Sequence, residues 1–257
     1  MKNLTPKAEQ NLKNIFGKNQ SLANSELWQT DGEFMSNYAN FAFDEVFSQS
    51  SDLDLQERIM LILGSLISVG GEAEYKIMLE AALNNGISPI AIKEIVYQAT
   101  PYIGIGKSME FILATNEVFK AKNISLPLAN QGKVKYENRQ ENGLETQRSI
   151  FGSAIDKGNA STPEELKHIR SFLSANCFGD YYTRGGLELK FRELLTFVFL
   201  ISLGGVESQV KAHIQGNLNM GQSRKSLISV VTALIPYIGY PRSLNALSAI
   251  DELTFKN

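Results

Sequence analysis

The segment 187–221, LELKFRELLTFVFLISLGGVESQVKAHIQGNLNMG, predicts a helical hairpin. Its apolar first part, 189–203, runs into Gly204-Gly205. A helix is expected to end there, because glycine readily adopts positive φ and has no side chain to pack. The second part, 207–220, has helical periodicity again and precedes another glycine. We therefore expect two antiparallel helices joined by a tight glycine turn.

Two polar side chains, Glu193 and His213, lie within these helices. Glu193 is eleven residues before Gly204, and His213 is eight residues after Gly205. At about 1.5 Å per residue, they lie roughly 16 and 12 Å from the turn. This difference is less than one helical turn, so antiparallel packing would bring the carboxylate and the imidazole together. A pair of this kind on an apolar wall can move a proton.

The composition excludes several classes of protein. Of 257 residues, 43% are hydrophobic and 20% charged, which is typical of a globular protein with a sizeable core. The net charge of -2 gives no basic surface for nucleic acid. The N-terminal segment lacks the apolar core of a signal peptide, and the longest apolar run is too short to span a bilayer. We therefore expect a cytoplasmic protein with no nucleic-acid or membrane partner. The single cysteine, Cys177, excludes an intrachain disulfide and a zinc site built on several thiolates.

The chain is an internal duplication. Segments in its first part recur 134 or 135 residues later, and the glycine pair of the hairpin is among the repeated features. The matching segments are 15–17 with 150–152, 53–71 with 187–205, 83–88 with 218–223, and 101–104 with 236–239. Each half is therefore one copy of the same domain.

The boundary between the copies is a polar stretch, 122–143, which contains one proline and two glycines and is predicted to be a linker across the surface. This places the first repeat at 1–121 and the second at 144–257. Hydrophobic periodicity is helical throughout, and no convincing alternating strand is present. The predicted fold class is all-α, as a tandem duplication of one helical domain.

Each repeat is expected to contain a third helix with a serine cap and a C-terminal helix. Ser88, followed by a proline, and Ser223 can cap these third helices, which are expected to end before Pro101 and Pro236. The C-terminal helices are predicted to include 109–119 and 244–253.

The two copies differ at the proposed pair. Glu193 corresponds to Ile59, and His213 corresponds to Met78. This pattern predicts that a site is kept in the second repeat and that the first repeat is structural. The alternative is a buried pair needed only for folding, which compensating apolar packing has replaced in the first copy.

Three further residues are candidates with two interpretations each. Arg192, which matches Arg58, could clamp a substrate carboxylate or pair with a neighbouring glutamate. Tyr237, which follows a helix-ending proline, could line a pocket or pack in the core. Cys177 could be a nucleophile or an inert buried thiol, and no spacing places it near His213.

At these residues the chain resembles the carboxymuconolactone decarboxylase family, in a tandem form that covers nearly the whole chain. The resemblance is carried by the segments 192–195, 204–205, 211–214, 218–221 and 236–239 and by their equivalents in the first half. It implies an alkylhydroperoxidase D-like helical domain. It also implies a homo-oligomer, as a trimer of tandem subunits that forms a pseudo-hexamer.

The family also includes thiol peroxidases, which carry Cys-x-x-Cys just before the histidine. Here Val206 and Gln209 occupy those positions, so the paired thiols are missing. The family histidine maps onto His213 and its glutamate onto Glu193. The decarboxylase-like activity that the resemblance implies needs no metal, thiol or cofactor.

We therefore expect cofactor-free decarboxylation of a small carboxylated lactone or related acid. In this hypothesis His213 exchanges the proton, Glu193 orients or charges it, and Arg192 steers the anionic substrate, with Tyr237 and Cys177 as further substrate-binding candidates. Two alternatives stay open: an antioxidant peroxidase that uses Cys177, and a non-catalytic helical assembly.

Overall fold

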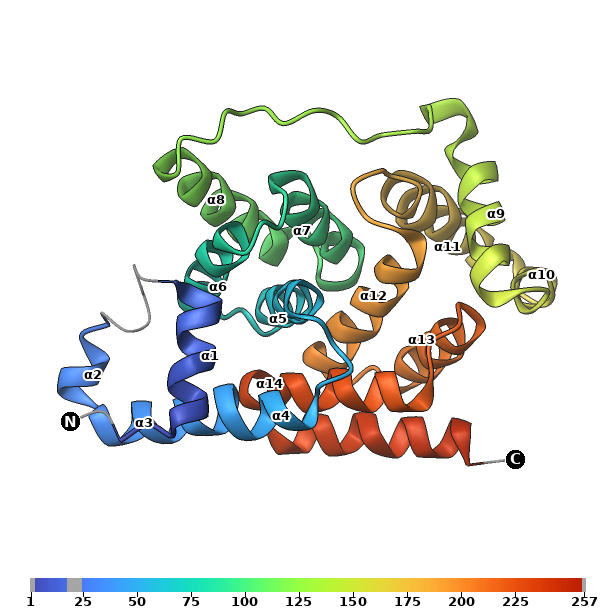
Figure 1. The fold of residues 1–257 in the computed structure, drawn as a ribbon. Helices are drawn as coiled ribbons and strands as arrows, with labels where there is room; N and C mark the ends of the chain where they lie inside the picture. Colours follow the sequence, from blue (N-terminus) through green and yellow to red (C-terminus); the bar gives the residue numbers. More distant parts are fainter. Residues whose placement is uncertain (1–2, 18–24, 256–257) are drawn as a thin grey trace.

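The computed structural model describes residues 3–17 and 25–255, and within them every regular element is a helix (Figure 1). This confirms the all-α fold class. Residues 1–2 and 256–257, at the outer ends of the predicted repeats, lie outside the described part. The first half contains α1 (Pro6–Phe16), α2 (Leu27–Thr30), α3 (Gly32–Asn40), α4 (Val46–Gln49), α5 (Leu55–Val69), α6 (Glu72–Asn84), α7 (Pro89–Ile103) and α8 (Ile105–Ala121). The second contains α9 (Arg139–Phe151), α10 (Ala154–Ala160), α11 (Lys167–Phe172), α12 (Leu189–Leu203), α13 (Glu207–Asn219) and α14 (Arg224–Thr254).

Short segments complete the helical path. A π-helical segment at Phe41–Glu45 joins α3 to α4, and a longer one at Leu173–Tyr182 continues α11. Single 3-10 turns precede α9 and α11, at Tyr136–Asn138 and Glu164–Leu166.

The predicted hairpin is α12 and α13. Helix α12 ends at Leu203, and Gly204 follows with φ 74° while its N–H donates to the Leu200 carbonyl at 3.1 Å. Gly205 also has positive φ, 72°, a conformation that costs glycine little. The turn therefore depends on both glycines, as the sequence predicted.

The two repeats share one break near their ends. In the first half Gly104 (φ 81°, ψ 156°) separates α7 from α8, and in the second Gly239 (φ 75°, ψ 167°) interrupts α14 at the equivalent position. Helix α14 thus corresponds to α7 and α8 together. The serine caps are confirmed, because Ser88 Oγ accepts from the Ala91 N–H and Ser223 Oγ from the Ser226 N–H.

The prediction that these helices end before their prolines is wrong. Helix α7 continues through Pro101 to Ile103, and α14 continues through Pro236 to the break at Gly239. A proline removes only one hydrogen bond, and within the last turn of a helix that loss is small compared with continued packing. The glycines, rather than the prolines, therefore set the ends.

The connection between the repeats is shorter than 122–143. Helix α9 already begins at Arg139, so Gly143 is helical. A Cβ atom on Gly143 would lie 1.8 Å from the Ser174 carbonyl oxygen and 2.6 Å from the Gly179 nitrogen. This glycine is therefore explained by close packing of α9 against the π-helical segment 173–182, and it does not mark a flexible linker.

The core is shared by the two halves. The first hairpin helices of the two repeats, α5 and α12, pack on each other at the centre, where Ser202 Oγ lies 2.9 Å from Ser65 Oγ (Figure 1). Helix α7 of the first half packs against α12 of the second, and α14 packs against α5. Each repeat therefore completes the core of the other.

Within the described residues one helix, α14, is long and apolar enough by composition to cross a membrane. It is interrupted at Gly239, and 44% of its most apolar window is buried against the rest of the chain. Core helices of globular proteins have the same properties.

Candidate active site

Glu193 and His213 meet between α12 and α13. The His213 Nδ1 atom lies 2.7 Å from Glu193 Oε1. The glutamate is fully buried, and the histidine is 9% exposed. The structure therefore brings together the two side chains that the hairpin geometry indicated, with the imidazole on the side that solvent reaches.

Two neighbouring residues hold this pair in place. Asn217, one turn after His213, donates to the backbone carbonyls of Glu193 (3.0 Å) and His213 (2.8 Å), which ties α13 to α12. Gly216 faces the carboxylate so closely that a Cβ atom there would lie 2.3 Å from Glu193 Oε1 and 2.8 Å from the Phe151 ring. The carboxylate therefore occupies space that only a glycine leaves free.

A chain of buried phenols continues from the glutamate. The Tyr182 hydroxyl donates to Glu193 Oε2 at 3.0 Å and lies 2.5 Å from the Thr196 hydroxyl. The Tyr102 hydroxyl in turn donates to the Tyr182 oxygen at 3.0 Å. Burial, followed by nearby acidic groups, raises the pKa of both tyrosines well above the ordinary value. Both phenols therefore stay protonated and act as hydrogen-bond donors.

Aromatic rings enclose the imidazole. Phe151 lies edge-on to His213 with ring centres 5.4 Å apart, and Tyr102 does so at 6.0 Å. Nδ1 is taken by Glu193, and no described residue forms a hydrogen bond with Nε2. This nitrogen is the polar atom of the pair that is left for a ligand.

Cys177 belongs to the same buried network but is not a thiolate. Its Sγ donates to the Tyr102 hydroxyl at 3.5 Å, and the side chain is buried. Burial is the main cause that raises the pKa of the thiol to about 12. At neutral pH the residue is a protonated thiol, which is a poor nucleophile.

Arg192 does not point toward a ligand site. Its guanidinium is fully buried and donates to Glu94 Oε2 (2.9 Å), Gln98 Oε1 (3.0 Å) and the Arg184 carbonyl (3.1 Å). Arg58 repeats the last contact in the first half, donating to the carbonyl of the residue eight positions before it. The arginine shared by both repeats therefore anchors the loop that precedes the hairpin, and this position gives no support to the prediction that Arg192 steers a substrate.

Tyr237 lies in the first half's cluster, away from His213. It lies close to Tyr38, whose hydroxyl donates to Glu74 Oε1 at 2.8 Å. The tyrosine beside His213 is Tyr102 of α7, the repeat equivalent of Tyr237, because α7 packs against α12 as well as against α5. The structure therefore does not bring Tyr237 to the pair of Glu193 and His213.

Sequence reasoning also missed Tyr182 and Gly216. The repeat alignment could have indicated Gly216, because the equivalent residue in the first half is Ala81. No sequence signal indicated Tyr182, which lies in the irregular π-helical segment before the hairpin. Among residues 3–17 and 25–255, no group of three or more His, Cys, Asp or Glu side chains could hold a metal ion.

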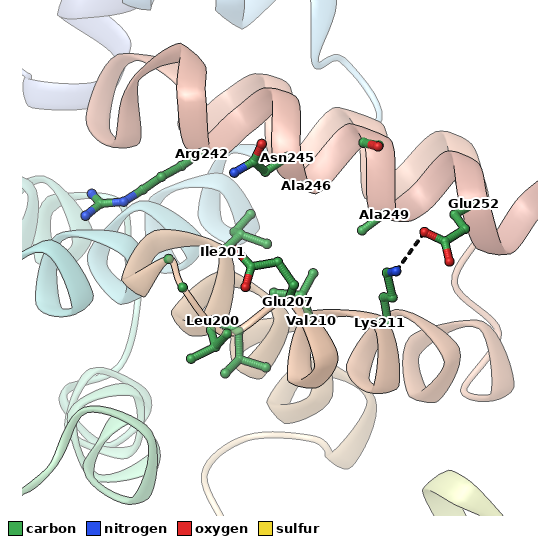
Figure 2. A pocket seen from close by; sticks show the side chains of 14 residues that line it. Leu200, Ile201, Glu207, Val210, Lys211, Arg242, Asn245, Ala246, Ala249 and Glu252 are labelled. Carbon is green, nitrogen blue, oxygen red and sulfur yellow. Dashed lines mark ion pairs between the residues drawn. The ribbon is translucent and has the colours of Figure 1, made fainter.

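Cavities flank the site without containing the pair. A groove of about 870 Å³ runs along the loop before α12 and is lined by Tyr182, which separates it from Glu193. Figure 2 shows another, of about 260 Å³, between the glycine turn, α13 and α14, where Lys211 pairs with Glu252 at 2.7 Å. The groove beside Tyr182 is the nearer of these two to the buried carboxylate network.

The comparisons with known proteins agree with this architecture. The model of the carboxymuconolactone decarboxylase family matches residues 32–117 and 168–252, more than half of the chain and once in each repeat. A 4-carboxymuconolactone decarboxylase from Acinetobacter baylyi is 29% identical over 122 residues, which cover 47% of this chain and 90% of that enzyme.

A crystal structure from Burkholderia xenovorans, described as a gamma-carboxymuconolactone decarboxylase subunit, shares the fold over nearly the whole length of both chains. Its TM-score is 0.55 at 19% identity, with 97% of each chain covered. The family match in both halves is the decisive finding. The chain belongs to the carboxymuconolactone decarboxylase family, as a tandem member with two family domains.

Proposed function

We propose that this protein is a cofactor-free decarboxylase-type enzyme that acts on a small carboxylated lactone or a related acid. The observation that carries the proposal is the 2.7 Å contact between His213 Nδ1 and Glu193 Oε1, together with an Nε2 atom that no described residue engages. A buried carboxylate bonded to one ring nitrogen fixes which nitrogen faces the ligand.

In the proposed reaction, the bond between the substrate carbon and its carboxylate breaks and CO₂ leaves. The electron pair stays on the substrate as a dienolate. His213 then delivers its Nε2 proton to the carbon and regains one from water. Glu193 holds the Nδ1–H throughout, so the charge of the imidazolium is balanced while it forms and disappears.

Tyr182 and Tyr102 are positioning residues in this scheme. Tyr182 donates to the second carboxylate oxygen of Glu193, and Tyr102 donates to Tyr182. These bonds leave Oε1 directed at the imidazole. We assign no substrate contact to Arg192, whose guanidinium is fully buried and whose two terminal nitrogens donate to groups inside the protein.

The peroxidase alternative has no support at Cys177. A thiol peroxidase needs a low-pKa thiolate, and burial raises the pKa of this thiol to about 12. The decarboxylase-type proposal is therefore the better one for this set of side chains.

We also infer that the protein is a cytoplasmic homo-oligomer, as a trimer of tandem chains. Support comes from large apolar side chains exposed at equivalent places on α8 and α14: Ile105 and Met109 in the first half, Tyr240 and Leu244 in the second. Exposed apolar surface of this kind favours association. Light scattering on the purified protein tests the inference, and a monomer would contradict it.

The test of the catalytic proposal is CO₂ release from 4-carboxymuconolactone and related lactone acids. The His213→Ala variant is expected to lose activity by roughly 10²-fold or more. His168→Ala, which removes the other, exposed histidine, is the matched control and should behave as the wild type. An active wild type whose turnover His213→Ala leaves unchanged would overturn the mechanism.

A further inference from the structure

A second cavity, of about 470 Å³, lies in the first half beneath the segment that connects the repeats. Neither Glu193 nor His213 lines it. Its walls are α7, α8, the connecting segment 126–131 and Arg184 of the second half. From α7 come Lys93, Glu94 and Tyr97, and from α8 Asn116. The cavity is therefore closed on one side by the chain that joins the two domains.

Lys93 is the unusual side chain in this cavity. It is only 5% exposed, yet no described residue forms an ion pair with it. Its ammonium group donates to Asn116 Oδ1 at 2.6 Å and to the Ile112 carbonyl at 3.4 Å. Burial lowers the pKa of this amine to about 8, so it is still mostly charged at neutral pH. Burying a cation without a counter-charge costs stability.

The surroundings do not neutralise this charge. Glu94 is the one carboxylate that lines the cavity within the described part of the chain, and two arginines already hold it. Arg184 binds it with Nε at 3.0 Å and Nη2 at 2.9 Å, and Arg192 Nη2 binds it at 2.9 Å. Around the cavity, three cationic groups are therefore accompanied by a single carboxylate, and Lys93 forms no ion pair with it.

An aromatic ring lies near two of these cations. The Lys93 ammonium is 5.9 Å from the centre of the Tyr97 ring, and the Arg184 guanidinium carbon is 5.3 Å from it. The cavity thus offers excess positive charge beside a flat apolar surface. This combination is complementary to a small organic anion.

The duplicated half shows that the fold does not require these residues. Positions 228, 229 and 232, the equivalents of Lys93, Glu94 and Tyr97, are Ile228, Ser229 and Thr232. The second repeat therefore builds the same helix with an isoleucine in place of the buried lysine. A polar group kept in one copy at a cost in stability points to a role other than folding.

We propose that this cavity is a second ligand site, which binds a small organic acid with its anionic group on Lys93 and Arg184 and its carbon skeleton against Tyr97. The site is separate from the proposed active site and does not depend on the reaction there. A carboxylate and a phosphate present the same chemistry to the two cations, so both belong in the test.

Isothermal titration calorimetry of the full chain at pH 7 and constant ionic strength tests the proposal, with benzoate, succinate and inorganic phosphate as probes. We expect saturable binding of at least one probe by the wild type. In Lys93→Ile, the residue type that the second repeat carries, the affinity should fall at least about tenfold. Lys120→Ile, which removes an exposed charge on α8, is the matched control and should bind as the wild type.

A second variant distinguishes a carboxylate ligand from a phosphate ligand. Tyr97→Leu keeps both cations, so it should weaken benzoate and leave inorganic phosphate unchanged. Binding of phosphate alone would identify a phosphate-bearing ligand, and binding of benzoate or succinate would identify a carboxylate. Equal affinity in Lys93→Ile and wild type overturns the proposal, as does a wild type that binds none of the three probes saturably.

Discussion

The two halves of this chain have the same helical fold but carry different side chains at the hairpin interface. At the hairpin interface the second half holds Glu193 and His213, while the first half holds Ile59 and Met78, which are 1% and 0% exposed. The frame therefore accommodates either an acid–base pair or hydrocarbon. What differs is the set of residues around the pair, because a buried carboxylate needs hydrogen-bond donors that an isoleucine does not.

The donors come partly from the opposite repeat. Tyr102 of the first half reaches the Glu193 network, and Tyr237 of the second half reaches the cluster of Tyr38 and Glu74. The first half therefore also has polar side chains near its hairpin, in the cluster of Tyr38 and Glu74. The comparison teaches that the functional unit is the pair of repeats, since each half contributes a tyrosine to the cluster of the other half.

Transplanting the first half's residues into the second should have the largest effect. The double variant Glu193→Ile with His213→Met is expected to fold, because the equivalent interface packs in the first half, and to lose CO₂ release by roughly 10³-fold or more. Circular dichroism and the activity assay measure the two properties. A folded double variant with full activity would show that the pair is not the catalytic one.

The Gly216→Ala substitution should have the second-largest effect. The added Cβ would approach Glu193 Oε1 to 2.3 Å, so the carboxylate must move away from the imidazole. We expect a loss of about 1–3 kcal/mol in the free energy of unfolding and a clear fall in kcat. The converse change Ala81→Gly in the first half should cost only about 1 kcal/mol, with activity kept, because no carboxylate lies there.

Lys93→Ile should change how stability depends on pH. The pKa of Lys93 is lowered from 10.5 to about 8 in the folded protein, so the unfolded chain binds more protons between these values. The free energy of unfolding of the wild type should therefore rise with pH across that window, by on the order of 2–3 kcal/mol.

The variant lacks this contribution and should be the more stable protein at pH 7. Urea unfolding at pH 7 and pH 10 measures the difference, with Lys120→Ile as the control. A wild type whose stability falls between those two pH values relative to Lys93→Ile would contradict the assignment.

Tyr102→Phe should have the smallest effect. It removes one donor to Tyr182 while the ring stays beside His213, so we expect a fall in kcat of about tenfold or less and a stability change near 1 kcal/mol. Tyr237→Phe, the equivalent change, should leave kcat unchanged. Equal effects of the two variants on kcat would remove the distinction between the repeats.

The sequence by itself determined the all-α duplication, the glycine-ended hairpin and the meeting of Glu193 with His213. These features depend on local periodicity, on the backbone freedom of Gly204 and on distances counted along two adjacent helices. Comparing the two copies also showed that the glutamate and the histidine are present only in the second repeat. These properties depend on residues that are close together in the sequence, so they can be predicted from the sequence alone.

Only the tertiary structure decided which side chains surround the pair. Packing of α7 against α12 places Tyr102 rather than Tyr237 beside the pair. Arg192 binds backbone carbonyls of the loop before α12, and Gly216 leaves room for the Glu193 carboxylate. These outcomes depend on contacts between segments far apart in the chain. The repeats give each segment two nearly equivalent partners, and the packing of the whole core decides between them.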